Sequence, residues 1–182
     1  MEKPVWRVRS SRYLVESPYM RLRVDEVELP NGTVVPDYYV REGAGFVSVF
    51  PLTERDTVVL VRQYRYGSDT IGLELPAGTL DRDEAPLACA CRELAEETGY
   101  EAATYELAAV YRPEPVRSNA FAYVFVARDA RRTREPRPDP TEHLEVEEVD
   151  VDEFRAMLRD GTIEAGSTIA AGYRALEFAG RL

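Results

Sequence analysis

The 182-residue sequence contains only two cysteines, one histidine and one lysine, and these scarcities exclude several classes of protein. Cys89 and Cys91 lie two residues apart and cannot form a disulfide framework, so a reducing compartment is expected. No apolar run approaches the roughly 18 residues that a membrane span requires, and the charged residues 1–12 do not resemble a secretory signal. We therefore expect a cytoplasmic protein that does not enter a membrane.

Positive charge is also scarce, since 23 basic residues face 33 acidic ones and the formal net charge is −10. This balance argues against nucleic acid as a partner and against docking on an anionic membrane. It also opposes an anionic substrate, unless a bound metal supplies local positive charge. With 45% hydrophobic residues, the chain is long and apolar enough to bury a core of its own.

The first third of the chain has the composition of β-strands, and Pro30-Asn31-Gly32 is typical of a hairpin turn. Strands and three helices are expected in the rest of the chain. The charged, proline-containing stretch 129–141 is expected to be a loop. The pattern predicts an α+β fold with a mixed sheet, divided into an N-terminal β-strand unit (1–45) and a main domain (46–182). The expected strands are 5–15, 20–29, 33–40, 46–52, 57–64, 73–75, 105–111, 121–127 and 144–149, and the expected helices are 85–98, 152–159 and 168–176.

The most informative stretch is 78–100, where a helix carries three glutamates close together. At 100° per residue, Glu93, Glu96 and Glu97 share one face within roughly 100° of arc. The opposite side, which is expected to pack on the sheet, is formed by Leu87, Ala88, Cys91, Leu94 and Ala95. Like charges at this spacing repel, whereas hard divalent cations require oxygen ligands. The glutamates alone are consistent with a metal site or with a solvated acidic face.

The whole stretch resembles the signature of the Nudix hydrolases, Gly-x5-Glu-x7-Arg-Glu-U-x-Glu-Glu-x-Gly-U, in which U is a bulky aliphatic residue. Every glycine and charged position matches, and Leu94 fits the first U, whereas Tyr100 departs from the second because it is aromatic. The resemblance implies a Nudix-type α/β/α sandwich whose loop–helix–loop binds Mg²⁺ or Mn²⁺ and hydrolyses a nucleoside diphosphate linked to another group.

The resemblance also assigns roles to individual residues. Glu93, Glu96 and Glu97 are the implied metal ligands, together with the main-chain carbonyl of Ala77. Glu97 and Arg92 are counted among the catalytic residues, with Arg92 and Glu84 as partners that hold the loop against the helix. A metal held in this way would neutralise phosphate oxygens and activate a water, which removes the conflict between the net charge and an anionic substrate.

The flanking segments resemble the ADP-ribose pyrophosphatase branch of the family. The sequence Arg-Gln-Tyr-Arg at 62–65, the sequence Leu-Glu-Leu-Pro-Ala-Gly at 73–78 and Pro115 carry this likeness, with Arg65, Glu74 and Pro115 as the implied substrate-binding residues. Arg65 offers bidentate donors to a diphosphate, or it forms an ordinary ion pair at a strand end. The loop around Pro115 departs from the form usual in that branch, so GDP-mannose or another nucleoside diphosphate sugar is an alternative to ADP-ribose.

Two glutamates on the late loop, Glu142 and Glu145, are candidates for the general base, because family members often place a glutamate there. Glu142 ranks first since it lies further into the loop, and either residue is otherwise a plain surface acid. His143, the single histidine, is expected to be solvated.

Trp6 and Tyr13 lie in the expected N-terminal strands. In the resembling branch such strands form a domain-swapped homodimer and cap the partner's adenine, while the alternative is an ordinary buried aromatic residue. The resemblance to this branch implies a homodimeric pyrophosphatase that cleaves ADP-ribose to AMP and ribose 5-phosphate. A non-catalytic nucleotide-sensing module is the alternative from another functional class.

Overall fold

The structure, a computed structural model, describes residues 5–182, which form two compact units. The N-terminal unit comprises the chain up to Ala44 together with the distant segment Arg112–Phe121. The main unit comprises Gly45–Tyr111 and Ala122–Leu182. No local sequence pattern links 112–121 to the first strands, because the link consists of contacts across some 70 residues of chain.

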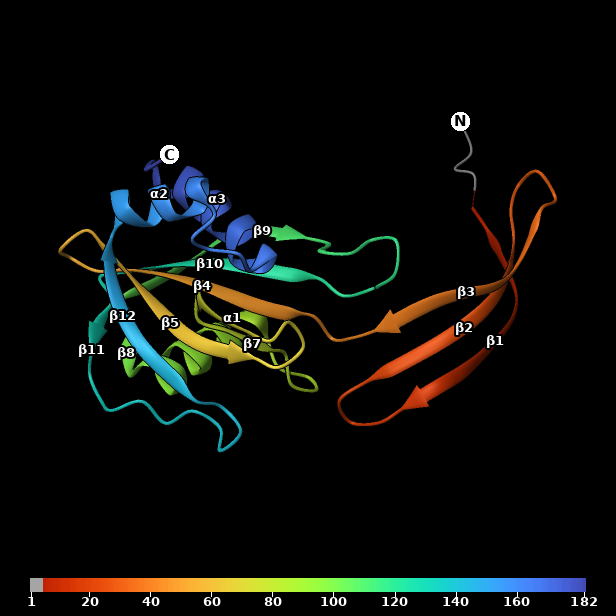
Figure 1. Cartoon of the computed structure of the whole chain (residues 1–182), viewed down its shortest axis with the longest axis horizontal. Helices are drawn as coiled ribbons and strands as arrows, with labels where there is room; N and C mark the ends of the chain where they lie inside the picture. The colour runs from red at the N-terminus through yellow and green to blue at the C-terminus, as the bar shows by residue number, and fades with distance from the viewer. Residues whose placement is uncertain (1–4) are drawn as a thin grey trace. The chain divides into compact units, whose positions relative to one another are not determined.

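The N-terminal unit is a three-stranded antiparallel sheet of β1 (Arg7–Glu16), β2 (Arg21–Glu28) and β3 (Val34–Glu42), paired in that order (Figure 1). Gly32, with φ of 84°, occupies the left-handed conformation that the β2–β3 turn requires. The segment 112–121 attaches to the end of β3, where the Arg41 amide donates to the Arg117 carbonyl at 2.8 Å.

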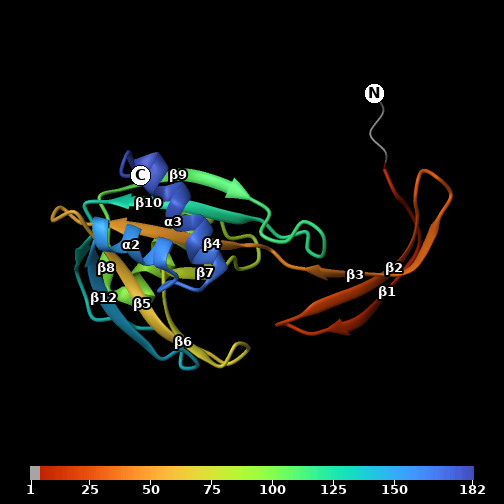
Figure 2. The ribbon, with the colours of Figure 1, turned by 45° about the horizontal axis from the view of Figure 1, so that its top comes forward.

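The main unit is built on a seven-stranded mixed sheet. β4 (Phe46–Leu52) and β5 (Thr57–Arg65) pair only next to the turn that joins them, at Leu52 and Val58. Away from the turn the two strands diverge. There β6 (Thr70–Glu74) pairs with β5, and β7 (Ala77–Thr79) pairs with β4. Figure 2 shows β6 following the far end of β5. The remaining strands are β12 (Leu144–Asp150) beside β5, and β10 (Ala122–Arg128) between β4 and β9 (Thr104–Tyr111).

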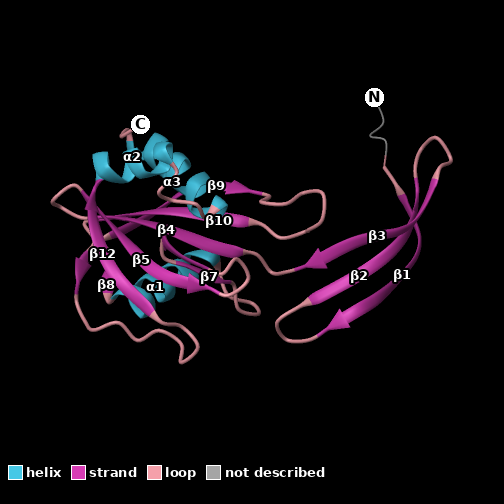
Figure 3. Ribbon diagram, viewed as in Figure 1, coloured by secondary structure: helices cyan, strands magenta, loops and turns pink. Residues whose placement is uncertain are grey.

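Helices cover both faces of this sheet, which confirms the predicted α/β/α sandwich (Figure 3). α2 (Val151–Asp160) and α3 (Gly166–Ala179) pack on one face through a core that includes Phe50, Leu60 and Phe154. α1 (Pro86–Glu93), continued by the π-helical turn η1 (Leu94–Thr98), packs on the other face. The short strands β8 (Tyr100–Glu101) and β11 (Arg131–Arg132) pair beside η1.

Neither α2 nor α3 begins with a side-chain capping hydrogen bond. Asp150 lies at the N-cap of α2, and α3 begins at Gly166 with Ala165 as its N-cap. Thr168 instead accepts a hydrogen bond from the Leu75 amide at 3.2 Å, which ties the start of α3 to the sheet. Within residues 5–182, no helix has the length and apolar character that crossing a membrane would require.

Candidate active site

The helix that carries the three glutamates turns its acidic side inward. Cys89, Ala90, Glu93, Leu94 and Glu97 are buried. Leu87 and Ala88, which the helical wheel placed on the packing side, are exposed, so that part of the prediction is wrong. The wheel assumed that apolar residues alone face the sheet, whereas here carboxylates and small apolar residues share the buried side. The last turn is also π-helical and departs from 100° per residue.

Gly78 on β7 makes room for the first of these carboxylates. A Cβ at this position would lie 1.8 Å from Glu93 Oε1 and 2.0 Å from its Cδ, so any larger residue would displace the Glu93 carboxylate. Glu93 itself is 8% exposed, and burial, together with the charges of Glu142 and Glu96, raises its pKa. The glycine at the start of the signature therefore has a steric reason in this structure.

Glu97 is the most deeply buried acid of the site, at 2% exposure. Its Oε2 accepts a hydrogen bond from the Ala77 amide at 3.1 Å, which joins the end of the helix to β7. Burial raises the pKa of Glu97 to about 8, and the charges of Glu93 and Glu142 act in the same direction. The carboxylates of Glu93 and Glu97 thus lie in an environment that disfavours their charged forms unless a cation binds between them.

Arg92 holds the loop before α1 against the helix. Its Nε and Nη2 donate to the two carboxylate oxygens of Glu84 at 2.9 and 3.0 Å, and this pairing lowers the pKa of Glu84 to about 2. Arg92 Nη1 also contacts Glu93 at 2.7 Å and Glu96 at 3.1 Å. The Arg92–Glu84 contact is the one that the resemblance implies, and it gives Arg92 a positioning role.

The donor set fits a hard divalent cation, because two buried carboxylates lie beside a third, Glu96, whose side chain is 47% exposed. Among residues 5–182 no three acidic, histidine or cysteine side chains already converge as a cage. Here the guanidinium of Arg92 pairs with both Glu93 and Glu96. Glu93, Glu96 and Glu97 would hold the cation once the first two exchange this contact for it.

Arg65, at the end of β5, forms a bidentate pair with Glu74 of β6, with both N–O distances at 2.8 Å. Both line a cavity of about 240 Å³ that also includes Ser68, Thr70 and Gly72. The Arg65 side chain is 46% exposed, so it remains open to a ligand while Glu74 fixes its plane. Its charge also acts on Glu97, which places it near the acidic site.

The two candidates for the general base lie in different surroundings. Glu142 is half-buried in the loop before β12, and its charge acts on Glu93, Glu97 and Arg65. Glu145 is exposed on β12, opposite Arg62, and its charge acts on that arginine. Of the two, Glu142 is the one with an electrostatic link to the buried carboxylates. His143 is exposed, as expected.

Tyr100, the aromatic departure from the signature, is buried, and its hydroxyl donates to Glu148 of β12. Glu148 also accepts from Thr57 at 2.9 Å. No local pattern pointed to Glu148, because its partner Tyr100 lies 48 residues away. The hydroxyl at position 100 therefore fastens the end of the signature to the sheet.

Pro115, Trp6 and Tyr13 all belong to the N-terminal unit. Pro115 is exposed in the attached segment, and Trp6 and Tyr13 are 44% and 42% exposed, so neither is the buried aromatic considered as an alternative. Trp6 packs edge-to-face on Tyr38, with ring centroids 5.5 Å apart. The exposure of these rings leaves them open to another surface.

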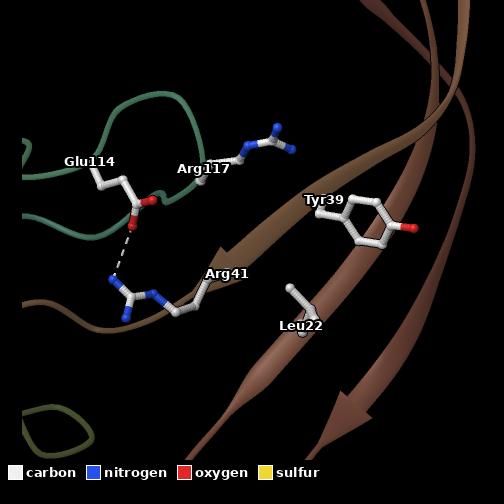
Figure 4. Close-up of a pocket in the computed structure, with 5 residues that line it drawn as sticks. All are labelled: Leu22, Tyr39, Arg41, Glu114 and Arg117. Atoms are coloured by element: carbon white, nitrogen blue, oxygen red, sulfur yellow. Dashed lines mark hydrogen bonds and ion pairs between the residues drawn. The ribbon is translucent and has the colours of Figure 1, made fainter. Parts of the chain in front are cut away.

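The same unit contains a pocket of about 500 Å³ (Figure 4). Leu22 of β2 and Tyr39 of β3 form its apolar part, and Arg41 pairs with Glu114 at 3.2 Å beside Arg117. These arginines have no local sequence signal, because the pocket forms only when 112–121 attaches to β3.

Comparisons with known proteins agree with this geometry. The NUDIX domain matches residues 44–171, and the nucleoside diphosphate sugar hydrolase N-terminal domain matches residues 6–40. The methanol dehydrogenase activator of Bacillus methanolicus is 32% identical over 84% of this chain and 82% of its own length. The ADP-ribose pyrophosphatase of Bacillus subtilis (strain 168) is 31% identical over 82% of this chain and 81% of its own.

Among solved structures, the crystal structure of an ADP compounds hydrolase matches with a TM-score of 0.83 at 21% sequence identity, covering 100% of this chain and 98% of the other. At that identity the likeness concerns the fold, and it agrees with the α/β/α arrangement described above.

Proposed function

The chain belongs to the Nudix hydrolase family, and from this premise we propose that it hydrolyses the pyrophosphate bond of ADP-ribose to give AMP and ribose 5-phosphate. The match of the first strands to a nucleoside diphosphate sugar hydrolase domain supports this substrate class. The likeness to an ADP-ribose pyrophosphatase over four fifths of the chain supports ADP-ribose within it. The observation that carries the proposal is the buried pair Glu93 and Glu97 beside β7.

Nudix ADP-ribose pyrophosphatases depend on a divalent metal, and we assign that ion as Mg²⁺, with Mn²⁺ as its substitute. Glu93, Glu96 and Glu97 hold it, together with the Ala77 carbonyl. When bound, the cation neutralises phosphate oxygens and lowers the pKa of a water. Arg92 and Glu84 keep the helix and its preceding loop in register, so that the carboxylates stay directed at one point.

The chain's own residues supply the remaining roles. Arg65, held in plane by Glu74, directs its guanidinium at a diphosphate oxygen, and Pro115 belongs to the substrate-binding loop. Glu142 accepts the proton of the attacking water, whose oxygen forms a bond to one phosphorus while the bridging P–O bond breaks. The link between Glu142 and the buried carboxylates supports it over Glu145 as the base.

We assign the chain's two parts as a dimerising N-terminal β-strand unit and a Nudix domain, and the assembly as a cytoplasmic homodimer. The exposed rings of Trp6 and Tyr13 and the neighbouring exposed Val8 support an interface on the N-terminal sheet. Such a sheet buries little of its own apolar surface, and a second copy of the same sheet would cover it.

A substrate panel tests the proposed function. ADP-ribose, GDP-mannose and a nucleotide set would be incubated with the protein, with Mg²⁺, with Mn²⁺ and with a chelator, and the products identified. We expect AMP and ribose 5-phosphate from ADP-ribose only when a cation is present. Preferred cleavage of GDP-mannose would move the specificity to the alternative substrate, and a silent panel would favour the nucleotide-sensing module.

A further inference from the structure

Gln63, the only glutamine in the chain, is 7% exposed on β5. Its side-chain oxygen Oε1 is buried and has no hydrogen-bond partner among the residues that the structure describes. Leaving a buried polar atom unsatisfied costs roughly 1–3 kcal/mol. Native proteins rarely leave such an atom without a function or a bound water.

The sheet register places Gln63 on the side of the sheet that faces α1 and η1. Alternate residues of a strand share a face, so Val59, Val61, Gln63 and Arg65 lie on the same one. Val59 belongs to the core cluster that packs against α1 and η1. Val146, directly opposite Val61 on β12, packs against the same cluster. Gln63 therefore faces the helix that carries the glutamates.

The neighbours of Gln63 on this face belong to the acidic site. Directly opposite it lie Gly72 on β6 and Leu144 on β12. Arg65 follows two residues later, and Glu142 comes two residues before Leu144; the charges of both act on Glu97. A Cβ at Gly72 would meet no atom within 4 Å, so open space adjoins Gln63 on that side. The unsatisfied oxygen thus belongs to a strand face that also carries Arg65, whose charge acts on Glu97.

The chemistry of the oxygen limits what it can bind. An amide oxygen only accepts hydrogen bonds or coordinates a cation, so it gains nothing from an unprotonated phosphate oxygen. Arg65, the nearest cationic side chain along the face, already donates two hydrogen bonds to Glu74. In a metal-dependent hydrolase, a water bound to the cation is a donor that suits this oxygen.

We propose that Gln63 is a positioning residue whose Oε1 accepts a hydrogen bond from a water in the hydration shell of the cation held by Glu93 and Glu97. This inference rests on the proposed function, because it requires a cation at those two glutamates. It adds a residue from the sheet to a site that the signature builds from the helix and its loop. Partners of this kind commonly alter metal affinity by 10–100-fold.

The test is a titration of Mn²⁺ into the substrate-free full chain, followed by water-proton relaxation, together with urea unfolding of the metal-free protein. We expect Gln63→Leu to weaken Mn²⁺ binding at least about 10-fold while the unfolding midpoint stays the same or rises, since an unsatisfied polar atom is removed. Gln63→Glu retains an acceptor oxygen and is expected to bind Mn²⁺ at least as well as the wild type.

Val61→Ala is the matched control, because Val61 is buried one position along the same face. It should lower the unfolding midpoint and leave Mn²⁺ affinity unchanged. Wild-type Mn²⁺ affinity in Gln63→Leu, or a loss of binding in proportion to lost stability in both variants, would overturn the inference. If Gln63→Leu does not fold, Gln63→Met keeps the unbranched shape and carries the same test.

The variant Glu97→Gln distinguishes a failure of this inference from a failure of the proposed function on which it rests. If Glu97→Gln loses Mn²⁺ binding and Gln63→Leu does not, the inference fails and the proposed function stands. If the wild type binds no Mn²⁺, or Glu97→Gln binds it normally, both fail.

Discussion

The two units of the chain differ in what they do with their apolar surface. The main unit buries two apolar clusters, one on each face of its sheet. Its acidic site lies beside the cluster that packs against α1 and η1. The N-terminal unit buries little more than Val24 and Val27, while Val8, Leu14 and Tyr19 are at least 42% exposed. The main unit is stabilised by its own core, whereas the N-terminal unit presents an apolar surface that suits a partner.

This difference in packing is the reason why chemistry and assembly are assigned to different parts of the chain. A buried carboxylate pair needs a rigid surround, which the packed main unit supplies through Gly78, Ala77 and Arg92. A three-stranded sheet without a core of its own cannot provide such a rigid environment, but its edge strands and its apolar face can bind another molecule.

A charge placed in the apolar surface of the N-terminal sheet should break the proposed dimer. In Val8→Asp the aspartate would be buried without a partner, which costs about 3–5 kcal/mol, so the dissociation constant should rise more than 100-fold. Sedimentation velocity over a concentration series measures this change. Leu107→Asp, at an exposed position of the main unit, is the matched control. Equal association of both variants and the wild type would refute the interface.

Gly78→Ala should damage the site without unfolding the main unit. The new Cβ would displace the Glu93 carboxylate, which lies 1.8 Å from its position, and a shifted ligand should lower kcat roughly 10–100-fold. The melting temperature should change little, because the displaced atoms end a flexible side chain. Gly67→Ala is the control, since a Cβ there meets no atom within 4 Å. Normal kcat in Gly78→Ala would contradict the steric role.

The Glu84–Arg92 pair should make part of the main unit's stability depend on pH. Folding lowers the pKa of Glu84 from 4.5 to about 2, so its contribution is complete above pH 4.5 and is lost as the pH falls toward 2. Glu84→Gln should cost about 1.5–3 kcal/mol at neutral pH. Urea unfolding from pH 7 to 3 should show the difference from wild type shrinking. A constant difference would argue against the pair.

Tyr100→Phe should give the smallest effect. Removing the hydroxyl leaves Glu148 with Thr57 and Arg55 as partners, so we expect a loss of about 1 kcal/mol in the free energy of unfolding. Urea denaturation at pH 7 measures it, and kcat should remain within a few fold of wild type. A large loss of activity would instead give the hydroxyl a direct part in the site.

Sequence patterns predicted most strands and all three main helical segments, because alternation and turn residues are local signals. The resemblance to the Nudix signature also singled out Glu93, Glu97 and Arg92, and their roles at the site stay predictions. The sequence patterns missed which side of α1 is buried, since an acidic face toward a sheet contradicts the usual amphipathic pattern. Gln63 and segment 112–121 acquire their places only through pairing between distant parts of the chain.

The turnover of ADP-ribose by Glu97→Gln at saturating Mg²⁺ tests whether the buried carboxylate holds a catalytic cation. Because Glu97 is assigned to the cation that activates water, kcat should fall by about 10²–10⁴-fold. The melting temperature of the metal-free protein should be unchanged or higher, since a buried carboxylate is neutralised. Glu153→Gln on the exposed side of α2 should behave as wild type. Near-normal turnover in Glu97→Gln would contradict the account.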